Sequence, residues 1–244
     1  MYRIYSVFIV VVGVILGGLI VLMLNFTPDT DVLVYPESNR VDARLWLLDV
    51  GTGLSTPTLL EATNPISWSP SGEQIAQARL EVDLAYIDLY DINTGDITSY
   101  PLDGIRVRAS AVSWSPDERY ITELVSPGNE DSFNLLDLQT GEMTDLIADS
   151  DIIDIRIRAW LPDSSDFLIV GRDSIDPIQN KLFRLTLNGE VTVLRDDISG
   201  RIQSIRVIDE RILYMIIDDT RIDIYDATAD NALIFSYETD HELD

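Results

Sequence analysis

The chain has 244 residues and a formal net charge of −25 at pH 7, from 17 basic and 42 acidic side chains. Because nucleic acids are bound through lysine and arginine contacts to phosphate, this charge argues against a nucleic-acid-binding protein. The hydrophobic fraction of 46% is sufficient for a packed core. The absence of cysteine excludes disulfides, thiol catalysis and thiolate metal sites.

The first predicted element is a transmembrane helix. No charged residue interrupts residues 4–24, and a helix needs roughly 20 apolar residues to cross a bilayer. Arg3 precedes this run and Asp29 and Asp31 follow it, so the positive-inside rule places the N-terminus in the cytoplasm and the rest outside it. A cleaved secretory signal, with an apolar region of about 7–15 residues, is the alternative. We therefore expect residues 1–26 to be a signal-anchor helix and residues 27–41 to be a linker and first edge strand.

The next feature is an internal repeat. Trp68, Trp114 and Trp160 are spaced 46 residues apart, each before a Pro-containing turn, and Asp91 and Asp137 have the same spacing. A period of this length predicts stacked structural units rather than one irregular core. A fourth unit at residues 204–213 is less regular. It is expected to have Arg206 in place of the tryptophan.

Each unit is predicted to be a four-stranded antiparallel sheet. In the clearest unit, apolar residues 111–114, alternating residues 119–125 and residues 133–138 are separated by Pro, Asp and Gly turns. Such sheets bury both faces only by packing on one another, which predicts an all-β propeller over residues 42–237, followed by an acidic tail at 238–244. About nineteen strands in five blades are expected, the first blade lacking its innermost strand. An open array that needs a second copy is the structural alternative.

Three motifs resemble the TolB-like, WD-repeat-like β-propeller family. They are Trp68-Ser-Pro-Ser-Gly72, Trp114-Ser-Pro-Asp117 and Asp91-Ile-Asn-Thr94-Gly95. The resemblance extends over roughly residues 42 to 237 and implies a platform for protein interactions in the periplasm or outside the cell. Other members of the family are the propeller half of peptidases.

No catalytic, cofactor or metal site is predicted. The single histidine, His241, is the fourth residue from the C-terminus, where we expect that a general base is not held in place. Nucleophile-elbow, phosphate-loop and zinc-protease motifs are absent from the sequence. Paired carboxylates could serve glycoside hydrolysis or bind calcium, but in so acidic a chain we expect them to be solvated turn residues: Asp151 and Asp154, Asp196-Asp197, and Asp218-Asp219.

Five arginines are the candidate ligand-binding residues, because they fall in or just before the first predicted strand of successive units: Arg106, Arg108, Arg156, Arg158 and Arg206. In a propeller this strand lines the central channel. There, guanidinium groups could bind a carboxylate in bidentate fashion. The structural alternative is that these arginines pair with aspartates of neighbouring blades.

The sequence thus predicts a single-pass cell-membrane protein that displays an extracytoplasmic propeller as a non-catalytic scaffold for an unknown protein partner, with no cofactor. Its longest rim loops, residues 126–131 and 171–179, would carry the interaction. The alternative is a ligand sensor or enzyme that uses a channel-facing Arg/Asp cluster for a small anion or acidic peptide.

Overall fold

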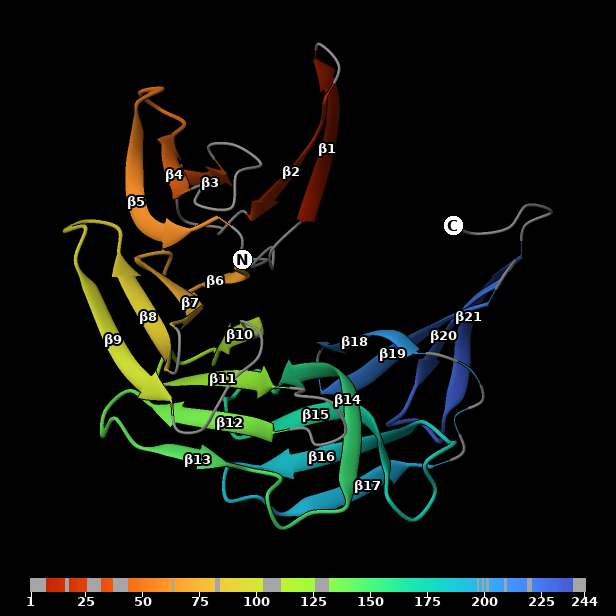
Figure 1. Ribbon diagram of the computed structural model, residues 1–244. Helices are drawn as coiled ribbons and strands as arrows, with labels where there is room; N and C mark the ends of the chain where they lie inside the picture. Colours follow the sequence, from red (N-terminus) through yellow and green to blue (C-terminus); the bar gives the residue numbers. More distant parts are fainter. Residues whose placement is uncertain are drawn as a thin grey trace. The chain divides into compact units, whose positions relative to one another are not determined.

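The computed structural model describes residues 8–15, 18–25, 32–36, 44–62, 64–81, 84–102, 111–125, 132–196, 198, 200, 202–208, 210–218 and 221–238. Every regular element in these ranges is a β-strand (Figure 1). Neighbouring strands pair antiparallel and follow chain order within each sheet. Local turn chemistry therefore sets the topology.

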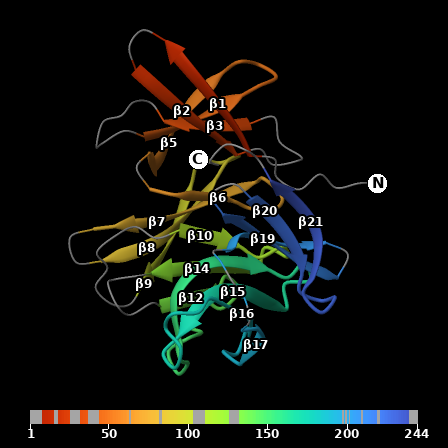
Figure 2. The same ribbon diagram turned by 90° about the vertical axis from the view of Figure 1, so that its right-hand side faces the viewer.

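The described strands after residue 31 form one three-stranded and four four-stranded sheets (Figures 1 and 2). The first sheet contains β3 (Val32–Pro36), β4 (Arg44–Asp49) and β5 (Ser55–Glu61). The other four contain β6 (Ile66–Trp68), β7 (Gln74–Leu80), β8 (Ala85–Asp91) and β9 (Ile97–Leu102); β10 (Ala111–Trp114), β11 (Tyr120–Val125), β12 (Ser132–Asp137) and β13 (Met143–Asp145); β14 (Ile152–Trp160), β15 (Asp166–Asp173), β16 (Lys181–Thr186) and β17 (Val191–Arg195); and β18 (Ile202–Ile208), β19 (Arg211–Asp218), β20 (Arg221–Asp226) and β21 (Ala232–Glu238). The predicted nineteen strands in five sheets, with an incomplete first sheet, are confirmed.

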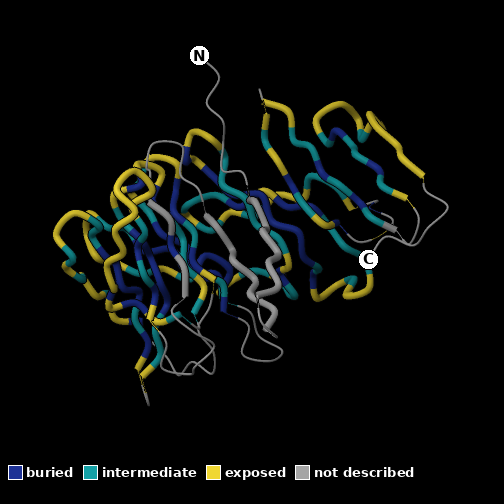
Figure 3. Tube along the Cα trace, turned by 90° about the horizontal axis from the view of Figure 1, so that it is seen from above, coloured by how far each residue is buried: buried dark blue, intermediate teal, exposed yellow. Residues whose placement is uncertain are grey.

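The chain divides into two compact units. One comprises Met1–Trp114, Glu118–Glu123 and Asp137–Glu142, and the other comprises Ser115–Asp117, Leu124–Leu136 and Met143–Asp244. Each unit has its own apolar core, and buried residues follow the strands while exposed residues gather at the turns (Figure 3).

Consecutive sheets share these cores. In the first unit, Leu45 and Leu47 of the first sheet pack with Ile75 of β7. In the second unit, Leu168 of β15 packs with Tyr214 of β19. Face-to-face packing buries the apolar face that a single sheet would leave in water.

The turns that follow Trp68, Trp114 and Trp160 share one backbone feature. Its fourth residue has a left-handed φ, of 76° at Gly72, 63° at Glu118 and 59° at Ser164. At the last two positions a side chain reaches the turn of the preceding sheet. The Ser164 hydroxyl accepts a hydrogen bond from the backbone N–H of Asp117 at 3.0 Å, and the Glu118 carboxylate accepts one from Ser71. These residues therefore carry a backbone cost that glycine avoids, and they gain a link between sheets.

Two substitutions at Ser164 separate the backbone cost of the left-handed φ from the stability gained through the hydrogen bond to Asp117. Ser164→Ala retains the left-handed φ and loses the hydrogen bond that the buried Ser164 hydroxyl accepts from Asp117, so the free energy of unfolding is expected to fall by about 1–2 kcal/mol. Ser164→Gly loses the same bond but relaxes the backbone, so its loss is expected to be about 1 kcal/mol smaller. Urea unfolding monitored by tryptophan fluorescence measures both. Equal losses in the two variants would show that the left-handed φ carries no cost.

The expected transmembrane helix is not what the structure shows. Residues 8–25 contain β1 (Phe8–Ile15) and β2 (Gly18–Asn25), which pair antiparallel from Phe8 opposite Asn25 to Ile15 opposite Gly18. Valine and isoleucine dominate the first of these segments, and β-branched residues favour strands. No helix within the described ranges combines the length and the apolar character that crossing a bilayer requires.

The expected equivalence of Arg206 with the tryptophans is confirmed in register. Trp68 pairs with Ile75, Trp160 with Phe167 and Arg206 with Leu213, each seven residues later along the chain. The side chain of Arg206 nevertheless differs in its surroundings. Val207, not Arg206, packs with the core shared by β14–β17 and β18–β21, as Trp68 packs with the core shared by the first two sheets. Arg206 pairs with Leu213 on the opposite face of its sheet and is exposed. Since side chains alternate along a strand, Val207 lies on the face that packs with this core and Arg206 lies on the other face.

Candidate interaction surface

The structure places three of the five predicted arginines. Arg106 and Arg108 lie outside the described residues. Arg156 and Arg158 lie two residues apart on β14, whereas Arg206 lies on β18 and donates its Nη1 to the carbonyl of Ile205 at 2.8 Å. Arg156 and Arg206 are thus engaged by partners within their own strands.

Asp154 organises the surroundings of Arg156. Its φ is 52°, and it lies in a bulge where the pairing of β14 with β15 shifts between Ile153 and Ile157. Gly171 on β15 makes room for this bulge, because an added Cβ would lie 3.1 Å from the Ile153 carbonyl oxygen. A bulge re-aims side chains.

The carboxylate of Asp154 binds two guanidinium groups. Arg156 donates its Nε to Oδ2 at 2.9 Å, and Arg172 donates its Nε to the same oxygen at 2.8 Å. Arg172 also donates its Nη1 to the carbonyl of Pro177 at 2.7 Å. Asp154 therefore fixes Arg172, and Arg172 fixes the middle of the loop that joins β15 to β16.

Both ends of this loop are fixed as well. The Lys181 ammonium lies 2.6 Å from a carboxylate oxygen of Asp173, across the base of the loop. The other carboxylate oxygen of Asp173 accepts the backbone N–H of Asp176 at 2.7 Å. Ser174 donates its hydroxyl to Asp151 at 2.9 Å and its N–H to the Asp151 carbonyl at 2.8 Å.

Two isoleucines project from this fixed frame. Ile175 is 81% exposed and Ile178 is 88% exposed, the highest values among the large hydrophobic residues that the structure describes. We call residues Ser174–Asn180 the β15–β16 loop. It holds two aliphatic side chains in water on a backbone that five polar contacts restrain.

The pKa values of the two aspartates that hold the loop are both lowered. Burial raises the pKa of Asp154, but the hydrogen bonds and charges of Arg156 and Arg172 outweigh it and hold the pKa below its ordinary value of 3.8. The hydrogen bond from Lys181, aided by the Asp176 N–H, lowers the pKa of Asp173. A carboxylate with a lowered folded-state pKa stabilises the fold above its ordinary pKa, and that contribution is lost as pH falls through the folded value.

The lowered pKa values of Asp154 and Asp173 predict that the second compact unit is destabilised by acid. The thermal unfolding midpoint is expected to be steady from about pH 7 to about pH 5 and to fall below about pH 4, as Asp154 and Asp173 become protonated. Calorimetry across this range measures it. Asp154→Asn removes one of the titrating groups, so its acid transition should be shallower than that of the wild type. An unchanged transition would show that Asp154 does not contribute.

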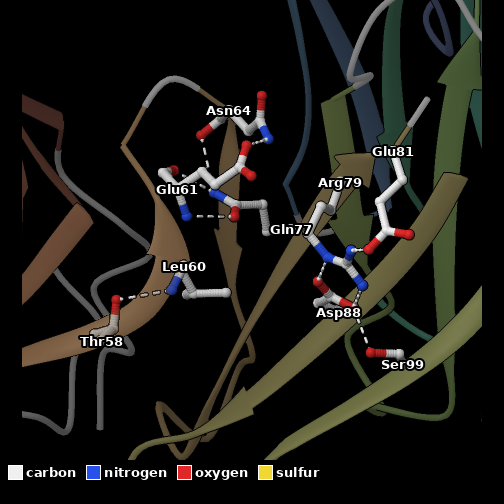
Figure 4. A network of polar contacts seen from close by, with 9 residues as sticks. All are labelled: Thr58, Leu60, Glu61, Asn64, Gln77, Arg79, Glu81, Asp88 and Ser99. Atoms are coloured by element: carbon white, nitrogen blue, oxygen red, sulfur yellow. Dashed lines mark hydrogen bonds and ion pairs between the residues drawn. The ribbon is translucent and has the colours of Figure 1, made fainter. Parts of the chain in front are cut away.

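The polar network of the first unit has a structural role (Figure 4). Gln77 is fully buried, donates to the Glu61 carbonyl at 2.7 Å and accepts the Glu61 N–H at 2.9 Å, so it ties β7 to the end of β5. Asp88 is buried, pairs with Arg79 and accepts the Ser99 hydroxyl at 2.6 Å. The members of this network satisfy one another.

The structure describes part of the predicted carboxylate pairs. Asp151 and Asp154 bind a serine and two arginines respectively, and Asp197 and Asp219 lie outside the described residues. No group of three metal-ligating side chains occurs in the described part of the chain.

The β15–β16 loop was predicted as a rim loop, but the exposure of Ile175 and Ile178 on it was not predicted. Its signal was a pair of isoleucines in an otherwise polar loop.

Comparison with known proteins identifies the fold. No protein-family model matches the chain, and no curated protein matches it in sequence. Among solved structures, it is similar to TolB from Acinetobacter baumannii, with 16% identity, a TM-score of 0.60, and coverage of 89% of this chain and 54% of that one. It is also similar to a structure from a study of two prolyl endopeptidases, with 13% identity, a TM-score of 0.69, and coverage of 93% and 38%.

A third similar structure is the oligogalacturonate lyase from Vibrio parahaemolyticus, with 14% identity, a TM-score of 0.65, and coverage of 87% of this chain and 64% of that one. The chain thus spans between 38% and 64% of the length of these three proteins. The likenesses show an all-β fold of TolB-like propeller type. Because this fold occurs in TolB, in a prolyl endopeptidase structure and in a lyase, function has to be argued from the site.

Proposed function

We propose that this chain is a protein-interaction module whose docking element is the β15–β16 loop. The observation that carries the proposal is the exposure of Ile175 and Ile178, at 81% and 88%, on a loop restrained at both ends and in the middle. Exposed aliphatic groups on a fixed backbone gain free energy when a partner pocket removes them from water, with little ordering cost.

The chemistry around the loop indicates the kind of partner. Lys181 pairs with Asp173, Asp176 adds a second carboxylate to the loop, and the chain as a whole carries −25. This charge disfavours anionic lipid headgroups and nucleic acid. We propose a protein with an apolar pocket bordered by basic side chains, because charge complementarity speeds association and sets the register.

Site-specific photocrosslinking tests this surface. With benzoylphenylalanine at position 178, we expect one discrete protein adduct in the native host, lost when Ile175→Asp is added. The matched control is position 54, since Leu54 is 69% exposed on the turn before β5. Purified wild-type chain should compete for the adduct and the Ile175→Asp variant should not. Adducts of equal yield from positions 178 and 54 would refute a specific docking loop.

We propose that residues 4–24 anchor the module in a membrane and that the propeller faces outward. The support is the uncharged run of the sequence and the charge difference around it. A two-stranded hairpin leaves edge N–H and C=O groups unpaired, which hydrocarbon does not tolerate, so in a bilayer this segment would have to become helical. Alkaline extraction of native membranes tests the anchor: the full chain should remain in the pellet.

The other proposals concern architecture and chemistry. We propose that the five sheets act as blades of one propeller-type module and that the module has no catalytic activity. A small-anion sensor built on the arginines is less well supported, because Arg156 and Arg172 share the carboxylate of Asp154. Two of the similar structures are enzymes by name, and assays of this chain with their substrate classes would reveal a retained activity.

A further inference from the structure

The first sheet repeats the register of three strands of the second sheet at a spacing of 42 residues. This spacing relates two pairs in each sheet: Val32 with Asp49 to Gln74 with Asp91, and Leu48 with Ser55 to Tyr90 with Ile97. The hairpins agree too, since the N–H of Asp49 donates to the carbonyl of Leu54, and that of Asp91 to the carbonyl of Asp96, each at 2.9 Å. The strands β3, β4 and β5 therefore correspond to β7, β8 and β9. In the described ranges no strand is paired with β3 in the place that β6 has beside β7.

The chain itself contains a counterpart of β6. The sequence Phe26-Thr27-Pro28 stands 42 residues before Trp68-Ser69-Pro70 and has the same order of an aromatic residue, a hydroxyl residue and proline. The strand β2 ends directly before Phe26, in the same compact unit as β3, and residues of the two strands lie within 8 Å of each other, Cα to Cα. The last two residues of β2 therefore have the positions of the first two residues of β6: Leu24 that of Ile66, and Asn25 that of Ser67.

The indole groups of two tryptophans give independent support for this position. The Nε1–H of Trp114 donates to the carbonyl of Ser67, on the innermost strand of the preceding sheet, at 3.0 Å. Trp68 is the equivalent tryptophan one sheet earlier, and its Nε1 is buried without a hydrogen-bond partner among the described residues. Asn25 stands 42 residues before Ser67. A buried N–H group without an acceptor lowers stability, and a carbonyl of Asn25 placed like that of Ser67 would supply the acceptor.

We propose that Leu24 and Asn25 bind the open edge of β3 as the innermost strand of the first sheet, and that the Asn25 carbonyl accepts the indole N–H of Trp68. The register of β6 with β7, carried back by 42 residues, places Leu24 opposite Tyr35 and Asn25 opposite Val34. The occupant of this edge is thus a segment of the same chain and the same compact unit. Its pairing satisfies backbone groups of β3 that an open edge would offer to other chains.

This pairing changes how the interaction module is attached. Residues 4–22 remain for the proposed membrane anchor, and they are within the range of about 17–25 residues that a span needs. The first blade then begins directly after the anchor, in place of the linker expected at residues 27–41, so the bilayer holds the module without a flexible tether. The pairing depends neither on the anchor nor on the β15–β16 loop, because β2 has a second edge besides the one that pairs with β1.

Disulfide trapping in the full chain, which contains no native cysteine, tests the register. In the second sheet the N–H of Ser69 donates to the carbonyl of Gln74, so by alternation the pair of Ile66 and Gln77 is not hydrogen-bonded and its Cβ atoms lie within reach of a disulfide. The equivalent double variant is Leu24→Cys with Tyr35→Cys. In detergent micelles it should oxidise at least about tenfold faster than Asn25→Cys with Tyr35→Cys, whose side chains would lie on opposite faces. Loss of maleimide labelling measures both rates, and circular dichroism verifies folding.

A pair inside the first sheet calibrates the oxidation. Leu48→Cys with Ser55→Cys replaces directly opposite residues beside the hydrogen-bonded pair of Asp49 and Leu54, and its rate should be within about tenfold of that of the Leu24 and Tyr35 pair. Equal rates for the matched and the shifted pair would overturn the proposal. A matched pair that stays reduced while the calibration pair oxidises would overturn it too, without bearing on the crosslink from position 178.

Hydrogen exchange of the indole N–H groups, followed by nuclear magnetic resonance, tests the contact with Trp68. Asn25→Pro removes the N–H that would donate to β3, so it should detach the strand. The indole N–H of Trp68 should then exchange at least about tenfold faster, whereas that of Trp114, which donates to Ser67, should be unchanged. Unchanged exchange at Trp68 would show that Asn25 is not its acceptor, and would overturn this part of the proposal.

Discussion

Phe167→Ala is expected to lower the free energy of unfolding by about 3–5 kcal/mol. The Phe167 side chain is 1% exposed. Its ring centroid lies 4.0 Å from that of Trp160 and 5.1 Å from that of Phe133, which it meets edge to face at 81°. Truncation removes buried apolar area and two aromatic contacts, and it leaves a cavity that these rigid rings fill poorly.

Urea unfolding followed by far-ultraviolet circular dichroism measures this loss. Phe167→Leu is the matched control, because it retains most of the volume and is expected to cost less than about 1.5 kcal/mol. If Phe167→Ala cost under about 1 kcal/mol, the ring would not be part of a packed core. The packing of β12, β14 and β15 through these aromatic rings would then be wrong.

Trp114→Ala is expected to lower the free energy of unfolding by about 3–5 kcal/mol, because Trp114 is 6% exposed and connects β10 with β6. Its indole Nε1–H donates to the carbonyl of Ser67 on β6 at 3.0 Å. Trp114→Phe retains much of the apolar contact and loses the hydrogen bond, so a cost of about 1–2 kcal/mol is expected. The difference between the two variants isolates packing from hydrogen bonding.

Hydrogen exchange shows whether this loss crosses between sheets. In Trp114→Ala, amide protection should fall in β6 and β7 as well as in β10, because the tryptophan connects them. Tyr120→Ala, a half-buried aromatic on the neighbouring strand β11, is the comparison. If protection falls in β10 and β11 alone, Trp114 is a residue of one sheet and the repeat is not a stack.

The sheets could be predicted from the sequence because their signals are local. The proline after Trp68 and Trp114 and the glycines of the Thr-Gly hairpins fix turn conformations, and Gly95 and Gly141 indeed have φ values of 77° and 75°. With the turns fixed, short alternating segments leave antiparallel pairing as the arrangement that buries their apolar faces. The presence of only three strands in the first sheet followed from the same count of segments.

The surroundings of Arg206 could not be predicted in this way. Alignment of Asp209 with Asp117 at two periods placed Arg206 at the position of the tryptophans, and Glu210, at the position of Glu118, indeed has a left-handed φ of 66°. The register is therefore retained, but Val207, one residue later, is the side chain that packs with the core shared with β14–β17. Repeat spacing predicts the register of a strand, whereas the face that packs depends on the neighbouring sheet.

Two further features depend on tertiary structure or solvent. The pairing of Asp154 with Arg172 depends on a bulge and on the space at Gly171, neither of which leaves a sequence pattern. The N-terminal apolar run is compatible with a helix in hydrocarbon and with the strands β1 and β2 that the structure shows. Hydropathy reports the burial of such a segment, and its surroundings decide its secondary structure.

The most direct test of the account is the affinity of the crosslinked partner for three forms of the chain. The forms are wild type, Ile175→Asp with Ile178→Asp, and Arg156→Ala with Arg158→Ala. The double isoleucine variant is expected to bind the partner more than about 100-fold more weakly, because it removes two anchor residues of the interface. The double arginine variant is expected to bind with an affinity within about threefold of that of the wild type. Loss of binding in the arginine pair with full binding in the isoleucine pair would contradict a docking loop and favour the anion-sensor alternative.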